Sequence, residues 1–226
     1  VMCGRYAISS PPDTLAKFLG VTGALPNFPA HYNCAPTQPL PVVRKSARGG
    51  REFSFMQWGL VPSWSKGPDT RFSMINARAE TAAIKPAYRG PFRQHRCLIP
   101  ADGFYEWQKT EDGKQPHFFS LKTKEPHGFA GLWDEWMGPH GDEILSFSII
   151  TTKANALVRP IHDRMPVILS PEYYGAWLGE DEPQSPKVLE ALLLPFPAEE
   201  MQCYPVSRRV NSPANDDADL VMPLAG

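Results

Sequence analysis

The sequence predicts an α+β fold dominated by β-strands, with a curved or barrel-like mixed sheet at its core and a few peripheral helices. Many short segments are rich in Phe, Val, Ile, Trp and Thr and are separated by breaks that contain Gly. Few segments carry helix start signals, and 42% hydrophobic with 11% aromatic residues suits an ordinary globular core. Because single β-rich domains often reach this length, we expect one domain over residues 1–226.

The strand prediction depends on β-branched and aromatic content and on alternation. Alternation of polar and apolar residues is clear over residues 52–57 and weaker over residues 144–152. The predicted strands cover residues 40–44, 52–58, 96–100, 104–108, 117–121, 128–133, 144–152, 165–169 and 203–206. Many short strands with few helices favour a strongly curved or closed sheet.

Helices are expected where Ser and Pro precede apolar residues. Residues 10–13 begin a short helix with apolar residues on one face, and Gly20 ends it. Residues 170–172 and 185–186 begin two more, because Pro is favoured at the first helical position, and Gly179 ends the first of these.

The chain shows no sign of a membrane, a disulfide or a metal. No apolar run reaches the length of a transmembrane helix and no secretory signal is apparent, so we expect a cytoplasmic protein. Without export, disulfides are not expected. The four cysteines are Cys3, Cys34, Cys97 and Cys203. They lack the spacing of a zinc site, so neither a metal nor a cofactor is expected. We interpret Cys34, Cys97 and Cys203 as buried residues without a role in the chemistry.

A net charge of −1 conceals a strong asymmetry between the two halves of the chain. Residues 1–100 carry 13 Lys and Arg against 4 Asp and Glu, a balance of +9. Residues 101–226 carry 10 against 20, a balance of −10. The asymmetry indicates a basic face toward a polyanion, unless the two halves interleave in space and neutralise each other.

Cys3 follows a Met that an aminopeptidase would normally remove, because Cys is small. A terminal Cys carries an α-amine with a pKa of about 7.7–8.0 beside a thiol near 8.5. This pair traps an aldehyde twice, first as an imine and then as a thiazolidine ring; the alternative is a small apolar residue in an N-terminal strand. With Val1 and Met2 attached, the nitrogen of Cys3 is part of a peptide bond and the ring could not form. Val1 could be an added residue, or the start codon could be assigned upstream of the true Met2.

Motifs along the whole chain resemble those of the SRAP family, the SOS-response-associated peptidases, now understood as abasic-site processing proteins. The matching segments follow the family's order: Met2-Cys3-Gly4-Arg5-Tyr6, Tyr32-Asn33-Cys34-Ala35-Pro36, Trp58-Gly59-Leu60-Val61-Pro62, Ile75-Asn76-Ala77-Arg78-Ala79-Glu80-Thr81, Ala101-Asp102-Gly103-Phe104-Tyr105-Glu106-Trp107, Ile161-His162-Asp163-Arg164-Met165-Pro166 and Pro205-Val206-Ser207-Arg208. The resemblance implies an SRAP-like fold over residues 1–226.

The resemblance also implies catalytic roles. Cys3 would form the thiazolidine with the ring-opened abasic deoxyribose, and Asn76 would hold the N-terminus and the sugar. Glu106 would act as general acid and base, and His162 would assist proton transfer, including in crosslink reversal. A buried Glu and a His suit proton transfers near pH 7. On the residues alone, Glu106 could also be a solvent-facing strand residue and His162 a structural histidine.

The basic half interleaves arginines with aromatic residues, which supply cations for phosphates and flat faces for bases. With the motifs, this predicts the DNA contacts Arg5, Asn33, Pro36, Trp58, Trp64, Arg78 and Arg164. Trp58 could instead belong to the core, and Arg89, Arg93 and Arg96 could form a solvated face. We expect a monomer whose partner is single-stranded DNA containing abasic sites, and nucleoid association when it is bound.

The function implied by the resemblance is covalent crosslinking to abasic single-stranded DNA, which protects the site in the DNA damage response. Autoproteolytic peptidase and AP lyase activities are further expectations. Two alternatives stay open: an N-terminal-nucleophile cysteine peptidase or amidase without a DNA role, and a noncatalytic binder of modified DNA. A serine hydrolase is disfavoured because the chain has no G-x-S-x-G.

Overall fold

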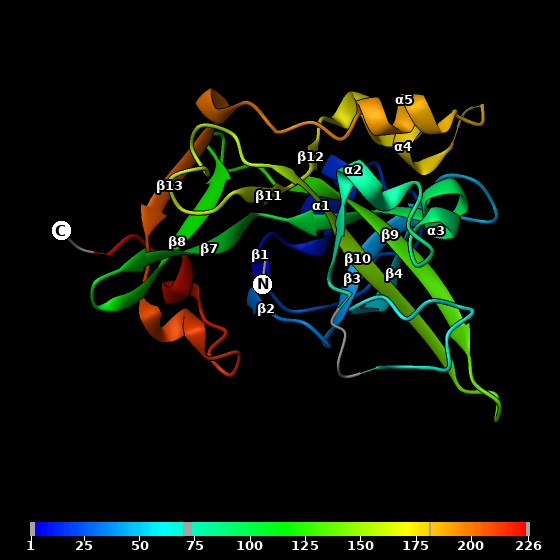
Figure 1. Ribbon diagram of the computed structural model, residues 1–226, viewed down its shortest axis with the longest axis horizontal. Coiled ribbons are helices and arrows are strands. Elements are labelled where there is room, and N and C mark those ends of the chain that lie inside the picture. The colour runs from blue at the N-terminus through cyan, green and yellow to red at the C-terminus, as the bar shows by residue number, and fades with distance from the viewer. Residues whose placement is uncertain (1–2, 70–73, 181, 225–226) are drawn as a thin grey trace.

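A closed five-stranded barrel forms the core of the computed structural model, which describes residues 3–69, 74–180 and 182–224 (Figure 1). Its strands are β3 (Pro39–Lys45), β4 (Arg51–Trp58), β6 (Arg96–Ala101), β9 (His127–Met137) and β10 (Glu143–Lys153). They pair in the order β10, β4, β3, β6, β9 and back to β10; the β10–β4 pair is parallel and the others are antiparallel. The predicted β-dominated fold with a barrel-like mixed sheet is confirmed.

Short strands extend the barrel sheet at β10 and β9. The strand β5 (Asn76–Arg78) pairs with β10 in parallel, and β11 (Arg164–Pro166) pairs with β10 antiparallel. The strand β12 (Ile168–Leu169) pairs with β9. These pairings attach the 76–78 and 164–166 motifs to one strand of the barrel.

A second, antiparallel sheet lies beside the barrel and contains the N-terminal strand. Its strand order is β13 (Met201–Pro205), β8 (Gly113–Leu121), β7 (Gly103–Thr110), β1 (Tyr6–Ile8) and β2 (His31–Cys34). In Figure 1 the β7–β8 hairpin and β13 extend to one side, while β1 and β2 lie next to the barrel. Each predicted strand segment overlaps an observed strand, whereas β1, β2 and β5 were not predicted.

Aromatic rings from both sheets pack into a shared core. Trp58 of β4 stacks on Phe147 of β10 with ring centroids 6.2 Å apart, and Tyr6 of β1 meets Trp58 edge to face at 5.1 Å. Phe104 of β7 packs at 6.2 Å against Phe129 of β9. Because burial of apolar surface is the main favourable term in folding, this core fixes the N-terminal strand against the barrel.

The helices are short and lie outside the sheets. They are α1 (Pro12–Leu19), α2 (Ala79–Ala82), α3 (Arg89–Gln94), α4 (Tyr174–Leu178) and α5 (Pro186–Ala191), with 3₁₀ turns at Pro171–Tyr173, Ala198–Glu200, Arg208–Asn211 and Ala218–Val221. The predicted starts are confirmed, and left-handed Gly20 and Gly179 end α1 and α4. In the described part of the chain, no helix has the length and apolar character needed to cross a membrane.

Candidate active site

A hollow of about 850 Å³, which we call the reactive pocket, gathers several of the predicted site residues. Its walls come from the N-terminal segment, the turn after β2, the β7–β8 hairpin, the loop between β10 and β11, and the C-terminal segment. The residues that line it are Gly4, Arg5, Pro36, Glu106, Trp107, Gln108, Lys109, Lys114, Pro160, Ile161, His162 and Asn211. Segments far apart in sequence therefore meet at this hollow.

The N-terminal segment brings Cys3 beside Glu106. Because β1 runs antiparallel to β7 with Tyr6 opposite Phe104, the residues ahead of β1 continue along β7 toward Glu106. The backbone N–H of Cys3 donates a hydrogen bond of 2.7 Å to Oε1 of Glu106. If the residues ahead of Cys3 are removed, this nitrogen is the α-amine, and the carboxyl lies within proton-transfer distance of it.

The Cys3 thiol is not an activated thiolate. Its side chain has no exposed surface, and its backbone has a φ of 32°, a left-handed conformation that strains a residue other than glycine. Burial, together with the nearby Glu106 carboxylate, raises the pKa of the Cys3 thiol well above its ordinary value. The thiol is therefore protonated near neutral pH, unlike the reactive cysteines of electropositive sites.

Glu106 is a buried carboxyl that titrates near neutral pH. Only 2% of its surface is exposed, and burial raises the pKa of Glu106 to about 7. The hydrogen bond from the Cys3 N–H acts in the opposite direction, and the charge of Asp163 raises the pKa further. A group with this pKa can both give and accept a proton at pH 7, which is what general acid–base catalysis requires.

His162 lines the reactive pocket from the loop between β10 and β11. The loop is held by Oδ1 of Asn155, which accepts a hydrogen bond of 3.0 Å from the N–H of Val158. The N–H of Arg164 donates to Nδ1 of His162 at 3.1 Å, so we assign the proton of the neutral ring to Nε2. A carboxylate oxygen of Asp163 lies 3.2 Å from the same Nδ1.

Arg5 is held at the reactive pocket by the C-terminal segment. Its Nη1 donates to Oδ1 of Asn33 at 2.9 Å and to the carbonyl of Val210 at 2.6 Å. Asn33 is 1% exposed, and its Nδ2 donates to carbonyls within residues 210–215. Asn33 thus positions Arg5 and the C-terminal segment, and in this structure it offers no surface to the predicted DNA ligand.

Asn76 and Arg78 lie on β5 and do not line the reactive pocket. Asn76 pairs with Ile149, and its carbonyl accepts a hydrogen bond of 3.0 Å from the hydroxyl of Tyr88. Its Nδ2 is buried and finds no partner in the described part of the chain, which is unfavourable. Arg78 is exposed and forms no ion pair with a described residue. In the described part of the chain the Asn76 amide therefore forms no hydrogen bond with Cys3, and its Nδ2 remains a free donor.

Two predicted DNA contacts belong to the fold instead. Trp58 has no exposed surface, and its indole N–H donates to the carbonyl of Ile75 at 3.0 Å, so its ring cannot stack on a base. Arg164 is 7% exposed and forms a bidentate pair with Glu80 at 2.6 and 2.9 Å. Its Nη2 also donates to the carbonyl of Thr151. In this structure neither side chain is available to a DNA ligand, because the core encloses the Trp58 ring and the Arg164 guanidinium is bound to Glu80 and Thr151.

Pro36 and Trp64 lie along a path that leads away from Glu106. Pro36 lines the reactive pocket, and the next residue, Thr37, lines a second hollow of about 880 Å³. Trp64 also lines this second hollow, and 67% of its surface is exposed. Two consecutive residues of the turn after β2 therefore line the two hollows, Pro36 the first and Thr37 the second.

The remaining cysteines take no part in the reactive pocket. All four thiols are free; Cys34 and Cys97 are buried, as expected, whereas Cys203 is only half-buried. Burial raises the pKa of the Cys203 thiol to about 11. Within residues 3–69, 74–180 and 182–224, no group of three or more His, Cys, Asp or Glu side chains could hold a metal ion.

Comparison with known protein families decides what kind of protein carries this pocket. The sequence profile of the family described as SOS response associated peptidase (SRAP) matches residues 2–213. The chain belongs to the SRAP family. Glu106, His162 and Arg5 all lie within the matched stretch.

Similar SRAP proteins are named abasic site processing proteins. YoqW of Bacillus subtilis (strain 168) is 40% identical over 223 residues, which cover 97% of this chain and 99% of that protein. HMCES of Gallus gallus is 37% identical over 224 residues, which cover 85% of this chain and 66% of that protein. A crystal structure of a Bacteroides thetaiotaomicron protein aligns over 99% of this chain and 100% of that one, with 28% identity and a TM-score of 0.87. The SRAP-like fold is thereby confirmed.

The reactive pocket of this SRAP chain contains residues that the sequence had not singled out. Nε1 of Trp107 donates a hydrogen bond of 2.7 Å to Oδ1 of Asn211. Trp107 could have been selected from the sequence, because it follows Glu106 in a segment that matches the family. Asn211 lies outside the matching motifs, so there was no reason to select it from the sequence. Lys109 and Lys114 face each other across the β7–β8 hairpin, which follows only from its register.

Proposed function

We propose that this SRAP protein captures abasic sites in single-stranded DNA covalently, with Cys3 as its N-terminal residue. The observation that carries the proposal is the hydrogen bond of 2.7 Å between the nitrogen of Cys3 and Oε1 of Glu106. The nitrogen that would attack an aldehyde thus lies beside a carboxyl whose pKa is about 7. The names of YoqW and HMCES support abasic sites as the substrate. The crosslink would shield the site during the DNA damage response.

Capture would proceed through two additions to one aldehyde carbon. The free α-amine of Cys3 adds to the aldehyde of the ring-opened deoxyribose, and loss of water gives an imine. The sulfur of Cys3 then adds to the imine carbon while its proton passes to the nitrogen, so the closed thiazolidine has lost one water in total. As an acid, Glu106 would protonate the departing hydroxyl; as a carboxylate, it would accept the proton of the attacking amine.

The raised pKa of the Cys3 thiol favours this order of events over peptide cleavage. An N-terminal-nucleophile peptidase needs a thiolate, and a buried thiol near a carboxylate resists ionisation. Aldehyde capture needs first an amine and only later a thiol. The residues ahead of Cys3 must leave before capture, through an aminopeptidase or through the protein itself. An AP lyase reaction would start from the same imine, so ring closure would compete with strand cleavage.

The DNA surface we propose starts at Arg5 and follows exposed cationic and aromatic groups. Arg5 lines the reactive pocket beside Glu106, and Pro36 leads to the hollow at Trp64. Arg78 adds an exposed cation on β5. Arginines neutralise phosphates and exposed aromatic rings stack on bases, as single-stranded DNA requires. DNA binding without catalysis would not require a buried carboxyl that accepts a hydrogen bond from the Cys3 nitrogen.

Replacing Arg78 with alanine should weaken binding to intact single-stranded DNA. Loss of one phosphate contact should reduce the log–log salt slope by about 0.7. Fluorescence anisotropy of a labelled strand at several salt concentrations measures both quantities. Arg48→Ala, at an exposed arginine of the β3–β4 turn, is the matched control and should keep the slope. If folded Arg78→Ala and Arg5→Ala proteins both keep the wild-type salt slope, these two arginines do not contact the DNA phosphates.

Replacing His162 with alanine should slow release of the crosslink more than capture. The sulfur must regain a proton as the thiazolidine reopens, and His162 lines the pocket with its neutral-ring proton assigned to Nε2. Single-turnover capture, and release into excess competitor abasic DNA, report the two rates across the pH range around neutrality. His140→Ala, at an exposed position in the β9–β10 turn, is the control. Equal release by His162→Ala and wild type would refute this role.

Incubation of Met2-initiated protein with three strands of one sequence tests the proposal. The strands are intact, abasic, or carry a tetrahydrofuran in place of the abasic sugar, which cannot open to an aldehyde. Only the abasic strand should give an adduct that survives heat and denaturant. An adduct of equal yield with the tetrahydrofuran strand would rule out aldehyde chemistry.

A further inference from the structure

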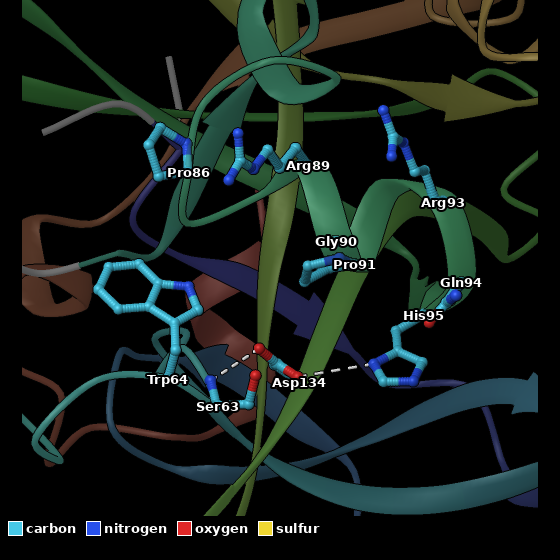
Figure 2. Close-up of a pocket in the computed structure, with 10 residues that line it drawn as sticks. All are labelled: Ser63, Trp64, Pro86, Arg89, Gly90, Pro91, Arg93, Gln94, His95 and Asp134. Carbon is cyan, nitrogen blue, oxygen red and sulfur yellow. Dashed lines mark hydrogen bonds and ion pairs between the residues drawn. The ribbon is translucent and has the colours of Figure 1, made fainter.

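A third hollow, of about 440 Å³, lies on the α3 side of Trp64 (Figure 2). The indole of Trp64 stands at one end, and α3 with Arg89 and Arg93 forms the opposite rim. In the same view Asp134 lies below α3, between Ser63 and His95. We call this hollow the flanking pocket.

The floor of the flanking pocket is a fixed carboxylate. Asp134 accepts hydrogen bonds from the N–H groups of Ser63 at 2.8 Å and Glu135 at 3.0 Å, and Nδ1 of His95 lies 3.6 Å away. Burial would raise its pKa, but the His95 side chain, together with these hydrogen bonds, holds the pKa of Asp134 below its ordinary value. The ring of His95 stacks on Trp133 with centroids 4.2 Å apart. An anion is therefore repelled from the floor and favoured only at the rim.

The rim supplies cations that the fold does not use. Arg89 and Arg93 are exposed, and neither side chain forms a hydrogen bond or ion pair with a described residue. Arg96, by contrast, is buried, and its guanidinium bonds the carbonyls of Phe92 and Arg93. The structure thus separates one structural arginine from two that are available to a ligand.

The flanking pocket continues the path that begins at the reactive pocket. Trp64 lines both the flanking pocket and the second hollow, and Thr37 of the second hollow follows Pro36 of the reactive pocket. A strand that leaves Glu106 past Pro36 can therefore pass Trp64 and reach Arg89. Because the ligand must present a flat ring to the indole and an anion to the rim, a nucleotide fits both requirements.

We propose that the flanking pocket binds a nucleotide of the same DNA strand, separated from the abasic site by the second hollow. Its base stacks on Trp64, and its phosphate is bound by Arg89 with Arg93 beside it. The inference rests on the proposed function, since it extends the path of the captured strand. It assigns Arg89 and Arg93 to DNA binding and Arg96 to the fold.

The test compares strands of different length around a central tetrahydrofuran, which binds without crosslinking. A short strand covers the reactive pocket, and longer ones extend it on the 5′ side or on the 3′ side. In wild type, extension on one side should raise affinity in anisotropy measurements. Trp64→Ala should cut affinity for that longer strand by about 5- to 100-fold, the contribution of one stacked base. Arg89→Ala and the double variant with Arg93→Ala should bring the long-to-short affinity ratio toward one.

Arg48→Ala should keep the wild-type ratio, which controls for the loss of any exposed arginine. Arg89→Ala keeps the test valid if Trp64→Ala misfolds, because the Arg89 side chain forms no hydrogen bond or ion pair with a described residue. Two results would overturn this inference and leave the proposed function standing. One is a long-to-short affinity ratio of one in wild type for extension on either side. The other is an unchanged ratio in the Arg89→Ala and double variants. If wild type binds neither the short nor the long strand, the proposed DNA function itself fails.

Discussion

Cys3→Ala should abolish the heat- and denaturant-stable adduct with abasic single-stranded DNA. Alanine at the N-terminus keeps the α-amine but has no sulfur, so the reaction stops at an imine that water hydrolyses. Borohydride reduces an imine to a stable amine, so the variant should still yield a product when the reductant is present. Denaturing gels with and without borohydride separate the two outcomes, with a complete loss expected in its absence.

The matched control for this variant is Cys203→Ala. Cys203 is a half-buried cysteine on β13, the edge strand of the second sheet, and it lies outside the reactive pocket. That variant should crosslink at the wild-type rate. A stable adduct in Cys3→Ala without borohydride, or wild-type attachment through Cys34, would contradict the assignment of Cys3.

Glu106→Gln should slow capture by about 10²–10⁴-fold, the usual range for a general acid–base group. Glutamine keeps the size of the side chain and can still accept the hydrogen bond from the Cys3 nitrogen, but it cannot exchange a proton. Noncovalent affinity for a tetrahydrofuran strand should hardly change. Single-turnover crosslinking gives the rate, and Glu190→Gln, at an exposed position in α5, is the control. Capture by Glu106→Gln at the wild-type rate would end the acid–base assignment.

The raised pKa of Glu106 also makes stability depend on pH. Because its folded pKa is about 7 and the unfolded value is about 4.3, the folded chain binds this proton more tightly. Glu106 therefore lowers the free energy of unfolding progressively as pH rises from about 4.3 to 7, and the loss is complete above that range. Glu106→Gln should remove this slope, so the variant gains stability relative to wild type at alkaline pH. Denaturant unfolding at acidic and alkaline pH measures the difference, and parallel profiles would contradict the raised pKa.

Sequence patterns predicted the positions of the long strands, but they did not predict the strand pairing that closes the barrel. The strands predicted at 52–58 and 144–152 are present as β4 and β10 because apolar and β-branched residues dominate both. Their parallel pairing, which closes the barrel, joins distant segments and leaves no local signal. The strands β1 and β5 have three residues each, too few for alternation to be read, and tertiary pairing alone defines them.

The candidate site divides along similar lines. The motifs singled out Cys3 and Glu106, and the structure brings their atoms together through the β1–β7 register. The motifs could not reveal that Trp58 is enclosed by the core, because an indole at the end of a strand suits either environment. Burial of Arg164 likewise follows from its partner Glu80, which lies 84 residues away in the sequence. Side-chain type was thus predictable, whereas exposure depended on distant contacts.

The intact mass of a Met2-initiated protein, before and after incubation with abasic single-stranded DNA, tests the central claim most directly. Before incubation, the mass should correspond to a chain that begins at Cys3. Afterwards it should equal protein plus DNA minus one water, and borohydride should leave that mass unchanged because the thiazolidine has no imine left to reduce. A covalent product that requires borohydride, or no product from a chain that begins at Cys3, would contradict capture through the amine and thiol of Cys3.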